Sequence, residues 1–362
     1  MAKYIYQDKN WTNFTWNDRA INAVFGEVRS MQGKLKGQMN SMGFSEKVEA
    51  ALSTLTLDVV KSSEIEGELL NYDQVRSSIA RRLGINTAGL VPSSRHIEGV
   101  VEMMLDATQR YDLPLTEKRL LGWHAALFPT GYSGPYEIEV GKYRTGEMQV
   151  VSGAMGKEKV HYEAIKPKFV KKEMDTFLDW FNRDEKMDAV LKAAIAHFWF
   201  IIIHPFDDGN GRVGRAIADM MLSRAEKSGE RFYSMSSQIL IERKRYYEVL
   251  QKVQHSSGDI TEWLEWFLNC LKNAMLSTEN TTHKILRKAE FWKLHDHVSI
   301  NERQRLMLNK LFDDFEGKLQ TSKWAKITKT SNDTALRDIK DLVEKGMLKQ
   351  TEEGGRNASY VL

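Results

Sequence analysis

Apolar residues recur at helical spacing through most of this chain. Near the N-terminus, Ile21, Val24 and Val28 fall on one face of a helix, and similar stripes continue from Arg95 to about Leu276. The chain contains six prolines, so few positions interrupt these stripes. The pattern therefore predicts a mainly α fold.

One stretch breaks the helical pattern with glycines and β-branched residues. Its two arms lie near 148–151 and 159–162, on either side of the Gly-rich segment SGAMGKE. This arrangement is typical of a β-hairpin, so we expect a small hairpin inside the helical region.

The tail from about Asn301 has a pattern of its own. It contains three helical stretches, over 302–315, 321–328 and 331–346, followed by two short arms that turn at GGRN. Three helices and a two-stranded ribbon predict a winged helix-turn-helix domain.

The charges on the last helix of this tail leave its role open. Arg337 and Lys340 could contact DNA phosphates, but Asp338, Asp341 and Glu344 share the segment and weaken a basic footprint. DNA binding therefore stands beside a protein-docking role and a purely structural one.

Length and composition predict a soluble protein of several domains. The chain has 362 residues, of which 52 are basic and 49 acidic, so its overall charge does not mark it as a nucleic-acid binder. We expect an N-terminal helical region at 1–90, a core at 91–285, and a linker with the winged helix at 286–362. The single cysteine, Cys270, cannot form an internal disulfide. No apolar run is long enough to span a membrane and no secretory signal is evident, so a cytoplasmic location is expected.

The segment HPFDDGNGRVGR, from His204 to Arg215, carries the most specific chemistry. Gly209, Gly211 and Gly214 match the G-x-G-x-x-G of dinucleotide-binding folds. That fingerprint needs a strand that runs straight into its first glycine, whereas a helical stretch precedes this one. A dinucleotide site is therefore disfavoured, and Gly214 is interpreted as a point of close helix packing.

The same residues predict a phosphate cradle. Pro205 should end the preceding helix at about Ile203 and project His204 beyond it. The next helix should start near Arg212, so an anion would lie at its positive end. Arg212 and Arg215 are three residues apart and can reach one phosphate chain together.

This segment resembles, without a departure, the H-x-F-x-[DE]-G-N-G-R-x-x-R signature of Fic-domain proteins. Those proteins typically transfer AMP from ATP to a protein hydroxyl. The resemblance implies a Fic-type helical core with a β-hairpin flap, and the opening YIYQDKNWTNFTWN and the segment VRSSIARRLG are similar to Fic proteins with a C-terminal winged helix.

The resemblance also implies a role for each position of the signature. His204 would be the general base for a Ser, Thr or Tyr hydroxyl, and Phe206 would anchor the loop. Asp208 would hold Mg²⁺ with the phosphates of ATP. Asn210 and the backbone amides from Gly209 to Gly211 would contact the phosphates. Arg212 would bind the α- and β-phosphates, and Arg215 would bind the γ-phosphate.

Softer similarities extend the site to the flap and the adenine side. Within 148–162, where a target protein would dock, Val151, Ser152 and Gly153 would line the nucleotide. Downstream, the adenine candidates are Tyr246, Tyr247 and Gln254. For the two tyrosines, a role as half-buried helix residues is an equal alternative.

A second, shorter motif lies upstream in SSEIEG. Ser62, Glu66 and Gly67 resemble the [ST]-x-x-x-E-[GN] inhibitory helix of Fic proteins, here at about 45–67. Ser62 and Glu66 share a helical face, and Gly67 can adopt the left-handed conformation that ends a helix. A carboxylate in a last helical turn needs a cation, which the family supplies as Arg215.

Together these features predict an autoinhibited protein adenylyltransferase that modifies a target protein or itself. Two alternatives remain open: removal of AMP by the same site, and a DNA-binding regulator whose Fic core senses nucleotide. Whether the chain forms a homo-oligomer is also left open.

Overall fold

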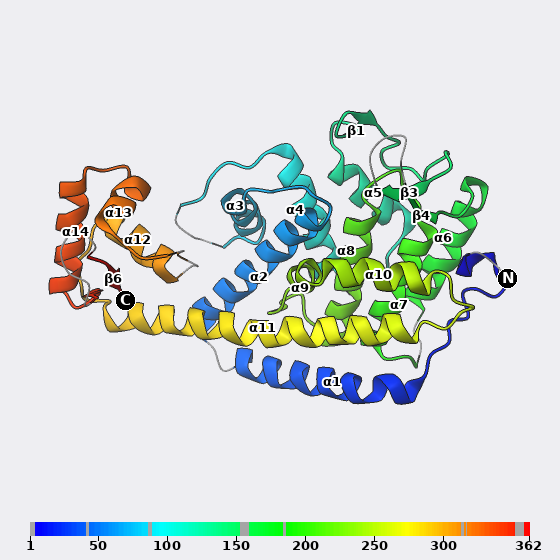
Figure 1. Ribbon diagram of the computed structural model, residues 1–362, viewed down its shortest axis with the longest axis horizontal. Coiled ribbons are helices and arrows are strands. Elements are labelled where there is room, and N and C mark those ends of the chain that lie inside the picture. The colour runs from blue at the N-terminus through cyan, green and yellow to red at the C-terminus, as the bar shows by residue number, and fades with distance from the viewer. Residues whose placement is uncertain are drawn as a thin grey trace. The chain divides into compact units, whose positions relative to one another are not determined.

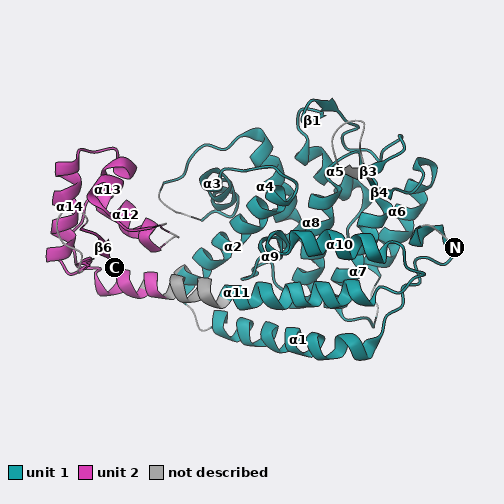
Figure 2. Ribbon diagram, viewed as in Figure 1, with its two compact units in different colours: residues 1–278 teal, residues 279–362 magenta. Residues whose placement is uncertain are grey.

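The computed structural model describes residues 4–40, 43–85, 89–152, 159–183, 186–312, 315, 317–351 and 358–362. Over these residues the chain is mainly helical, as the apolar pattern predicted, with short two-stranded sheets (Figure 1). It divides into two compact units, residues 1–278 and 279–362 (Figure 2). Across the described residues, no helix is long and apolar enough to cross a membrane.

The first half of unit 1 consists of helices that precede a pair of hairpins. The helices are η1 (Ile5–Gln7), α1 (Asp18–Asn40), α2 (Phe44–Ile65), α3 (Tyr72–Arg82), α4 (Arg95–Gln109) and α5 (Glu117–Leu127). The antiparallel hairpins pair β1 (Tyr132–Ser133) with β2 (Tyr136–Glu137), and β3 (Gln149–Ser152) with β4 (Lys159–Glu163). The second hairpin has both expected arms, while the turn between them lies outside the described residues.

Helices complete unit 1. They are α6 (Pro167–Asn182), α7 (Ala189–Ile203), α8 (Asn210–Glu226), α9 (Met235–Ile241), α10 (Arg243–Val253) and the long α11 (Thr261–Leu294), which contains the boundary between the units. In Figure 1, α1 runs alongside the first half of α11, where Lys272 and Glu27 form an ion pair at 3.0 Å.

The pair α7 and α8 forms the centre of unit 1. Helix α7 is apolar on almost every side and correspondingly buried, because other helices surround it. A Cβ on Gly214 would lie 3.0 Å from Ile201 Cδ1. Gly214 is thus a point of close packing between the two helices, as interpreted from the sequence.

A buried charge cluster fastens α2 to this centre. Arg231 forms ion pairs with Asp58 of α2 at 3.1 Å and with Asp219 of α8 at 2.6 Å. All three side chains are at most 2% exposed. Burial, reinforced by the nearby carboxylate of Asp219, raises the pKa of Asp58 to about 7. The two carboxylates tolerate each other because one guanidinium lies between them.

Unit 2 has three helices and a short ribbon, in the order that the tail pattern predicted. Its elements are α12 (Glu302–Phe312), α13 (Thr321–Thr328), α14 (Asn332–Glu344), β5 (Lys349–Gln350) and β6 (Tyr360–Val361). The turn at GGRN lies outside the described residues. Asp338 is buried against Arg303 at 2.8 Å, so it is not a surface charge of α14. DNA binding by this unit stays a prediction.

Replacing the central cation of the buried cluster tests how firmly α2 is attached. Arg231→Met leaves Asp58 and Asp219 buried without a cation, so we expect the free energy of unfolding to fall by about 3 to 5 kcal/mol. Urea unfolding followed by far-UV circular dichroism measures it. Lys244→Met, which removes a cation that is 92% exposed, is the control and should change stability by less than about 0.5 kcal/mol. An equal effect of the two variants would contradict the role of the cluster.

Candidate functional site

The signature segment forms a turn between α7 and α8. Helix α7 ends at Ile203, and His204 then adopts a left-handed conformation with φ 51° and ψ 60°. Gly209 is also left-handed, with φ 82°. Helix α8 begins at Asn210, two residues earlier than the start near Arg212 that the sequence suggested. The loop is therefore shorter than expected, and the helix N-terminus lies closer to His204.

Arg144 holds the strained backbone at His204. Its Nε donates to the carbonyl of His204 at 2.8 Å, and its backbone N–H donates to the carbonyl of Pro205 at 2.9 Å. The remaining guanidinium nitrogens donate to the carbonyls of Gly146 and Ile165. A non-glycine residue in the left-handed conformation costs about 1 to 3 kcal/mol, and it persists only where the surrounding structure holds it. Sequence analysis missed Arg144, because no local pattern indicates that an arginine between two turns is buried.

His124 and Asn210 close the loop from within. Gly141 N–H donates to His124 Nδ1 at 3.0 Å, so Nε2 carries the proton that points to the Asp208 carbonyl at 3.2 Å. The His124 ring stacks on Phe206 with centroids 4.1 Å apart, which accounts for the anchoring expected of Phe206. His124 was also missed, since a histidine inside a helical stripe carries no sequence signal of this role.

Asn210 was expected to contact the phosphates, and its side chain is engaged within the turn. Its buried side chain accepts a hydrogen bond from the Phe206 N–H at 3.0 Å and donates one to the Phe206 carbonyl at 2.8 Å. The N–H of Gly209 is likewise engaged, by Asp208 Oδ1 at 2.5 Å. The first backbone bond of α8 runs from Val213 N to Gly209 O, so the N–H groups of 210–212 have no partner within the helix.

The imidazole of His204 is oriented as a proton acceptor. Its Nδ1 lies 3.3 Å from the carbonyl of Ile201, which can only accept, so Nδ1 carries the hydrogen and Nε2 has a free lone pair. Burial lowers the pKa of His204 to about 4, and the charge of Arg144 acts in the same direction. The ring is therefore neutral near pH 7.

Asp208 presents a carboxylate suited to a hard cation. Its oxygens accept hydrogen bonds from Ser133 Oγ and Gly209 N, and the side chain is 42% exposed at the edge of the turn. In the described part of the chain, no cluster of three or more His, Cys, Asp or Glu residues could bind a metal by itself. Asp208 fits a Mg²⁺ ion that takes most of its oxygens from phosphates and water.

Arg215 binds the end of α2. Its Nε donates to Ser62 Oγ at 2.9 Å, and its Nη2 donates to the Ser62 carbonyl and to Glu66 Oε1, both at 2.8 Å. Helix α2 stops at Ile65, and Gly67 is left-handed with φ 86°, as its motif suggested. The structure thus brings together the three charged and polar groups that the upstream motif and the signature were expected to join.

The carboxylate of Glu66 lies against the N-terminal turn of α8. A Cβ on Gly211 would lie 2.1 Å from Glu66 Oε1, so only glycine allows this approach. The position is the positive end of a helix, where an anion is favoured. Glu66 therefore occupies part of the predicted phosphate cradle.

Arg212 has a carboxylate partner that sequence analysis missed. Its Nη1 donates to Glu68 Oε2 at 2.8 Å, and its guanidinium lies 5.0 Å above the Phe128 ring. Among the described residues, Arg212 Nε and Arg215 Nη1 are buried without a hydrogen-bond partner. These donors could be satisfied by phosphate oxygens. The only sequence signal for Glu68 was its place just after the motif.

The flap candidates are partly described. Val151 and Ser152 lie on β3, and Gly153 lies outside the described residues. Gln254 does not present an open side chain. It is 5% exposed, and its side chain donates to the carbonyl of His161 on β4 at 2.8 Å. Gln254 thus fastens the flap to the end of α10.

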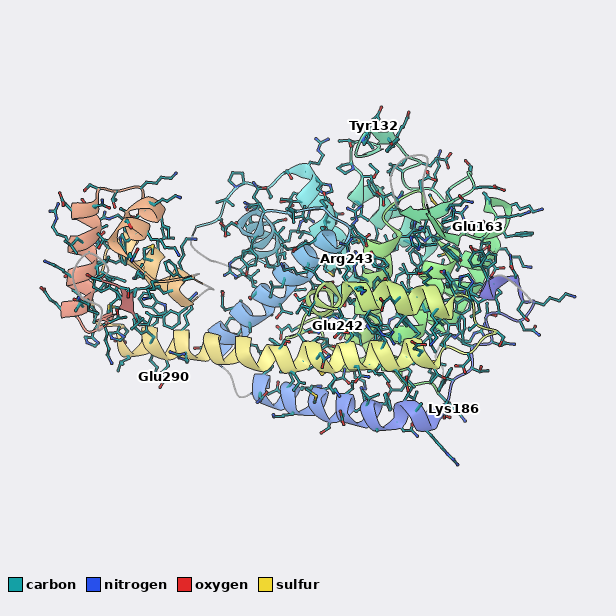
Figure 3. All side chains as sticks on the ribbon, in the orientation of Figure 1. Tyr132, Glu163, Lys186, Glu242, Arg243 and Glu290 are labelled. Carbon is teal, nitrogen blue, oxygen red and sulfur yellow. The ribbon has the colours of Figure 1, made fainter. Side chains whose placement is uncertain are left out.

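The N-terminal segment fastens the same strand. Ile5 N–H donates to the Gln254 carbonyl at 2.7 Å, and Tyr6 OH donates to the carbonyl of Glu163 at 2.9 Å. Glu163 is the last residue of β4 (Figure 3). The base of the flap is therefore held by two segments far apart in the sequence.

The two tyrosines of α10 have different environments. Tyr246 is 2% exposed, and its hydroxyl lies 2.9 Å from His197 Nε2, so it is a core residue that satisfies a buried histidine. Tyr247 is 42% exposed, and Arg243 lies 5.8 Å from its ring centre, where α9 meets α10 (Figure 3). Tyr247 is thus the one of the pair that has exposed surface.

Two sequence families match parts of the chain. The Fic/DOC family matches residues 114–222, and a domain of unknown function, DUF4172, matches residues 4–85. The Fic/DOC match includes the whole signature turn and the hairpin before it. The DUF4172 match includes α2 with Ser62, Glu66 and Gly67.

Curated relatives carry adenylyltransferase names. Protein adenylyltransferase fic-1 of Caenorhabditis briggsae is 29% identical over 184 residues, or 48% of this chain and 32% of the relative. The Caenorhabditis elegans protein of the same name is 26% identical over 218 residues, or 57% of this chain and 39% of the relative. The chain thus spans less than half the length of these relatives.

Solved structures share the fold. A Fic family protein from Desulfovibrio desulfuricans G20 has a TM-score of 0.56 at 22% identity and covers 97% of both chains. A structure of Fic-1 from Caenorhabditis elegans has a TM-score of 0.51 at 21% identity, over 72% of this chain and 73% of that one. These similarities show a Fic-type helical architecture.

Titration of the His204 ring by NMR tests the environment described for it. Because burial disfavours the charged ring, we expect a neutral Nδ1–H tautomer at pH 7 and a midpoint near the pKa of about 4. Loss of the signal in His204→Ala assigns it. A midpoint at the ordinary value of 6.5 would contradict a desolvated, neutral His204.

Proposed function

Because the chain is a Fic-domain protein, we propose that it is an autoinhibited protein adenylyltransferase. It transfers AMP from ATP to a Ser, Thr or Tyr hydroxyl of a target protein or of itself and releases pyrophosphate. The observation that carries this proposal is the free lone pair of His204 Nε2 beside two arginines with unsatisfied buried N–H groups.

The turn supplies each part of such a transfer. The target hydroxyl oxygen attacks the α-phosphorus, the bond to the β-phosphate oxygen breaks, and the hydroxyl proton passes to His204 Nε2. Arg212 and the free N–H groups at the start of α8 stabilise the charge that develops on the phosphates. A Mg²⁺ ion shared by Asp208 and the phosphates would offset the charge of the leaving pyrophosphate. Tyr247 is the candidate for contact with the adenine.

The target is proposed to dock on the flap. Strands β3 and β4 form an isolated two-stranded sheet, and Val150 and Val160 expose 37% and 40% of their surface on it. An extended peptide can add a strand to such an edge and bring its hydroxyl over the turn. The hydrogen bonds from Gln254 and Tyr6 hold β4 in place for this docking.

Inhibition is proposed to come from Glu66. Its carboxylate forms an ion pair with Arg215, which would otherwise bind the γ-phosphate. The same carboxylate fills the space in front of Gly211. ATP then meets a negative charge where its own terminal phosphate should lie. Removal of Glu66 should release the arginine for productive binding.

Labelled ATP tests the reaction. With the label on the α-phosphate, Glu66→Gly should incorporate more label into protein than the wild type, by roughly 5- to 150-fold, because a competing ion pair is lost. His204→Ala in the same background should lose roughly 10²- to 10⁴-fold. Glu64→Gly is the matched control. Within the part of the chain that the structure describes, Glu64 pairs with Lys61 of α2 and with no residue of the signature, so this variant should label like the wild type.

Each other outcome of the labelling has a distinct meaning. Incorporation from the γ-phosphate would identify a kinase instead. Release of AMP from a modified target, lost with Glu66, would favour the reverse reaction. Absence of α-label in Glu66→Gly with an added lysate as target would contradict the proposal.

The pH dependence of transfer provides a separate check. His204 acts as a base only when neutral, and burial lowers its pKa to about 4, so activity is present above that value and lost as the pH falls through it. In Glu66→Gly, the rate at saturating ATP should change less than about twofold between pH 8 and pH 6. A rate that halves near the ordinary histidine pKa of 6.5 would contradict this assignment.

A further inference from the structure

The chain reverses direction between Glu66 and Glu68. Gly67 is left-handed with φ 86°, and the N–H of Glu68 donates back to the carbonyl of Ser63 at 3.0 Å. This closure of the helix end turns the residue after Gly67 toward α8 as well. Two carboxylates therefore approach the signature arginines from the same turn.

Glu68 is the strongest anionic partner of Arg212. The guanidinium is 6% exposed, and its Nη1 lies 2.8 Å from Glu68 Oε2, whereas Asp208 Oδ2 is 3.9 Å from its Nη2. A buried cation without an anion is costly, so Arg212 requires a negative partner whenever phosphate is absent. Glu68 provides it.

Glu68 also has a second partner outside the cradle. Its Oε1 contacts Nε2 of His96, in the first turn of α4. The hydrogen bond to His96 and the charge of Arg212 hold the pKa of Glu68 below its usual value, so it is charged at neutral pH. The side chains of Glu68 and His96 are 35% and 33% exposed, which leaves them free to move toward solvent.

We propose that Glu68 is a second carboxylate of the nucleotide site, which occupies Arg212 until phosphate displaces it and then remains bound to His96. This inference rests on the proposed function only in assigning Arg212 to the α- and β-phosphates. On this proposal, Glu68 competes with the nucleotide phosphates for Arg212. That effect is separate from the effect of Glu66 on the γ-phosphate.

The two carboxylates have different signatures in binding. Glu66 holds Arg215 and faces the terminal phosphate, so its removal should favour ATP over ADP. Glu68 holds Arg212, which both nucleotides would contact through the phosphates they share. Its removal should strengthen ATP and ADP binding alike. Isothermal titration with ADP therefore isolates Glu68 from Glu66.

The experiment compares Glu68→Gln with Glu64→Gln in the full chain. Glutamine keeps the size of Glu68 but removes its charge and one of its two acceptor oxygens, so the Kd for ADP should fall on the order of tenfold. Glu64→Gln removes one acidic charge from the last turn of α2, where Glu64 pairs with Lys61, and should leave the Kd unchanged. An unchanged or higher Kd in Glu68→Gln, or an equal change in both variants, would overturn the proposal. Glu68→Ala should repeat the gain and shows that the effect does not depend on the new amide.

A double-mutant cycle tests the transfer of Glu68 to His96. His96→Ala should weaken ADP binding roughly threefold or more in the wild type. Without His96, Glu68 has no partner once the phosphates of ADP have displaced it from Arg212. The same change should have no effect in Glu68→Gln. Equal effects in the two backgrounds would overturn the role of His96.

The result is independent of the transferase assay. If Glu66→Gly transfers no label but Glu68→Gln binds ADP more tightly, the proposed function fails and the phosphate-site role of Glu68 stands. If label is transferred and the ADP affinity does not change, the reverse holds.

Discussion

The ion pairing of buried arginines with α2 is the constraint on which the site depends. Arg215 is 2% exposed and donates to the hydroxyl and carbonyl of Ser62 and to Glu66. Two turns earlier on α2, Asp58 pairs with Arg231. Removing the anion from a buried cation is strongly destabilising. We therefore expect α2 to stay packed on α8 unless another anion replaces the α2 carboxylate. Attachment of α2 and the proposed inhibition thus use one kind of interaction, for which the phosphates of the proposed nucleotide would compete.

The turn between α7 and α8 contains a strained backbone that neighbouring groups hold in place. His204 is left-handed, and the guanidinium of Arg144 binds its carbonyl together with those of Gly146 and Ile165. Burial is the main cause of the lowered pKa of His204, and the positive charge of Arg144 acts in the same direction. Arg144 therefore holds the backbone that projects His204 and also favours the neutral form of its imidazole. The side chain of Asn210 supports the same turn through the N–H and the carbonyl of Phe206.

Local patterns predicted what local chemistry controls. The end of α7 at Ile203 follows from Pro205, and the left-handed Gly67 follows from the end of its helix. The hairpin arms and the close packing at Gly214 were also predictable, because strand alternation and glycine have short-range signals. The start of α8 was misplaced by two residues, since Gly209 begins the helix without a side-chain cap. The sequence left Tyr246 open between a pocket and a half-buried helix position and named Gln254 as a pocket candidate, because a helical stripe does not show how deeply each side chain is buried.

The sequence by itself determined the inventory of the site, because base, carboxylate and arginines lie within one segment of twelve residues, His204 to Arg215. Only the tertiary structure decided which partner each charge takes. Glu66 and Glu68 lie 149 and 144 residues from the arginines they bind. Pairing over such separations depends on the packing of α2 against α8 and on the loss of water around both. Neither is encoded in the residues next to a charge, so Glu68, Arg144 and His124 became evident only in the folded protein.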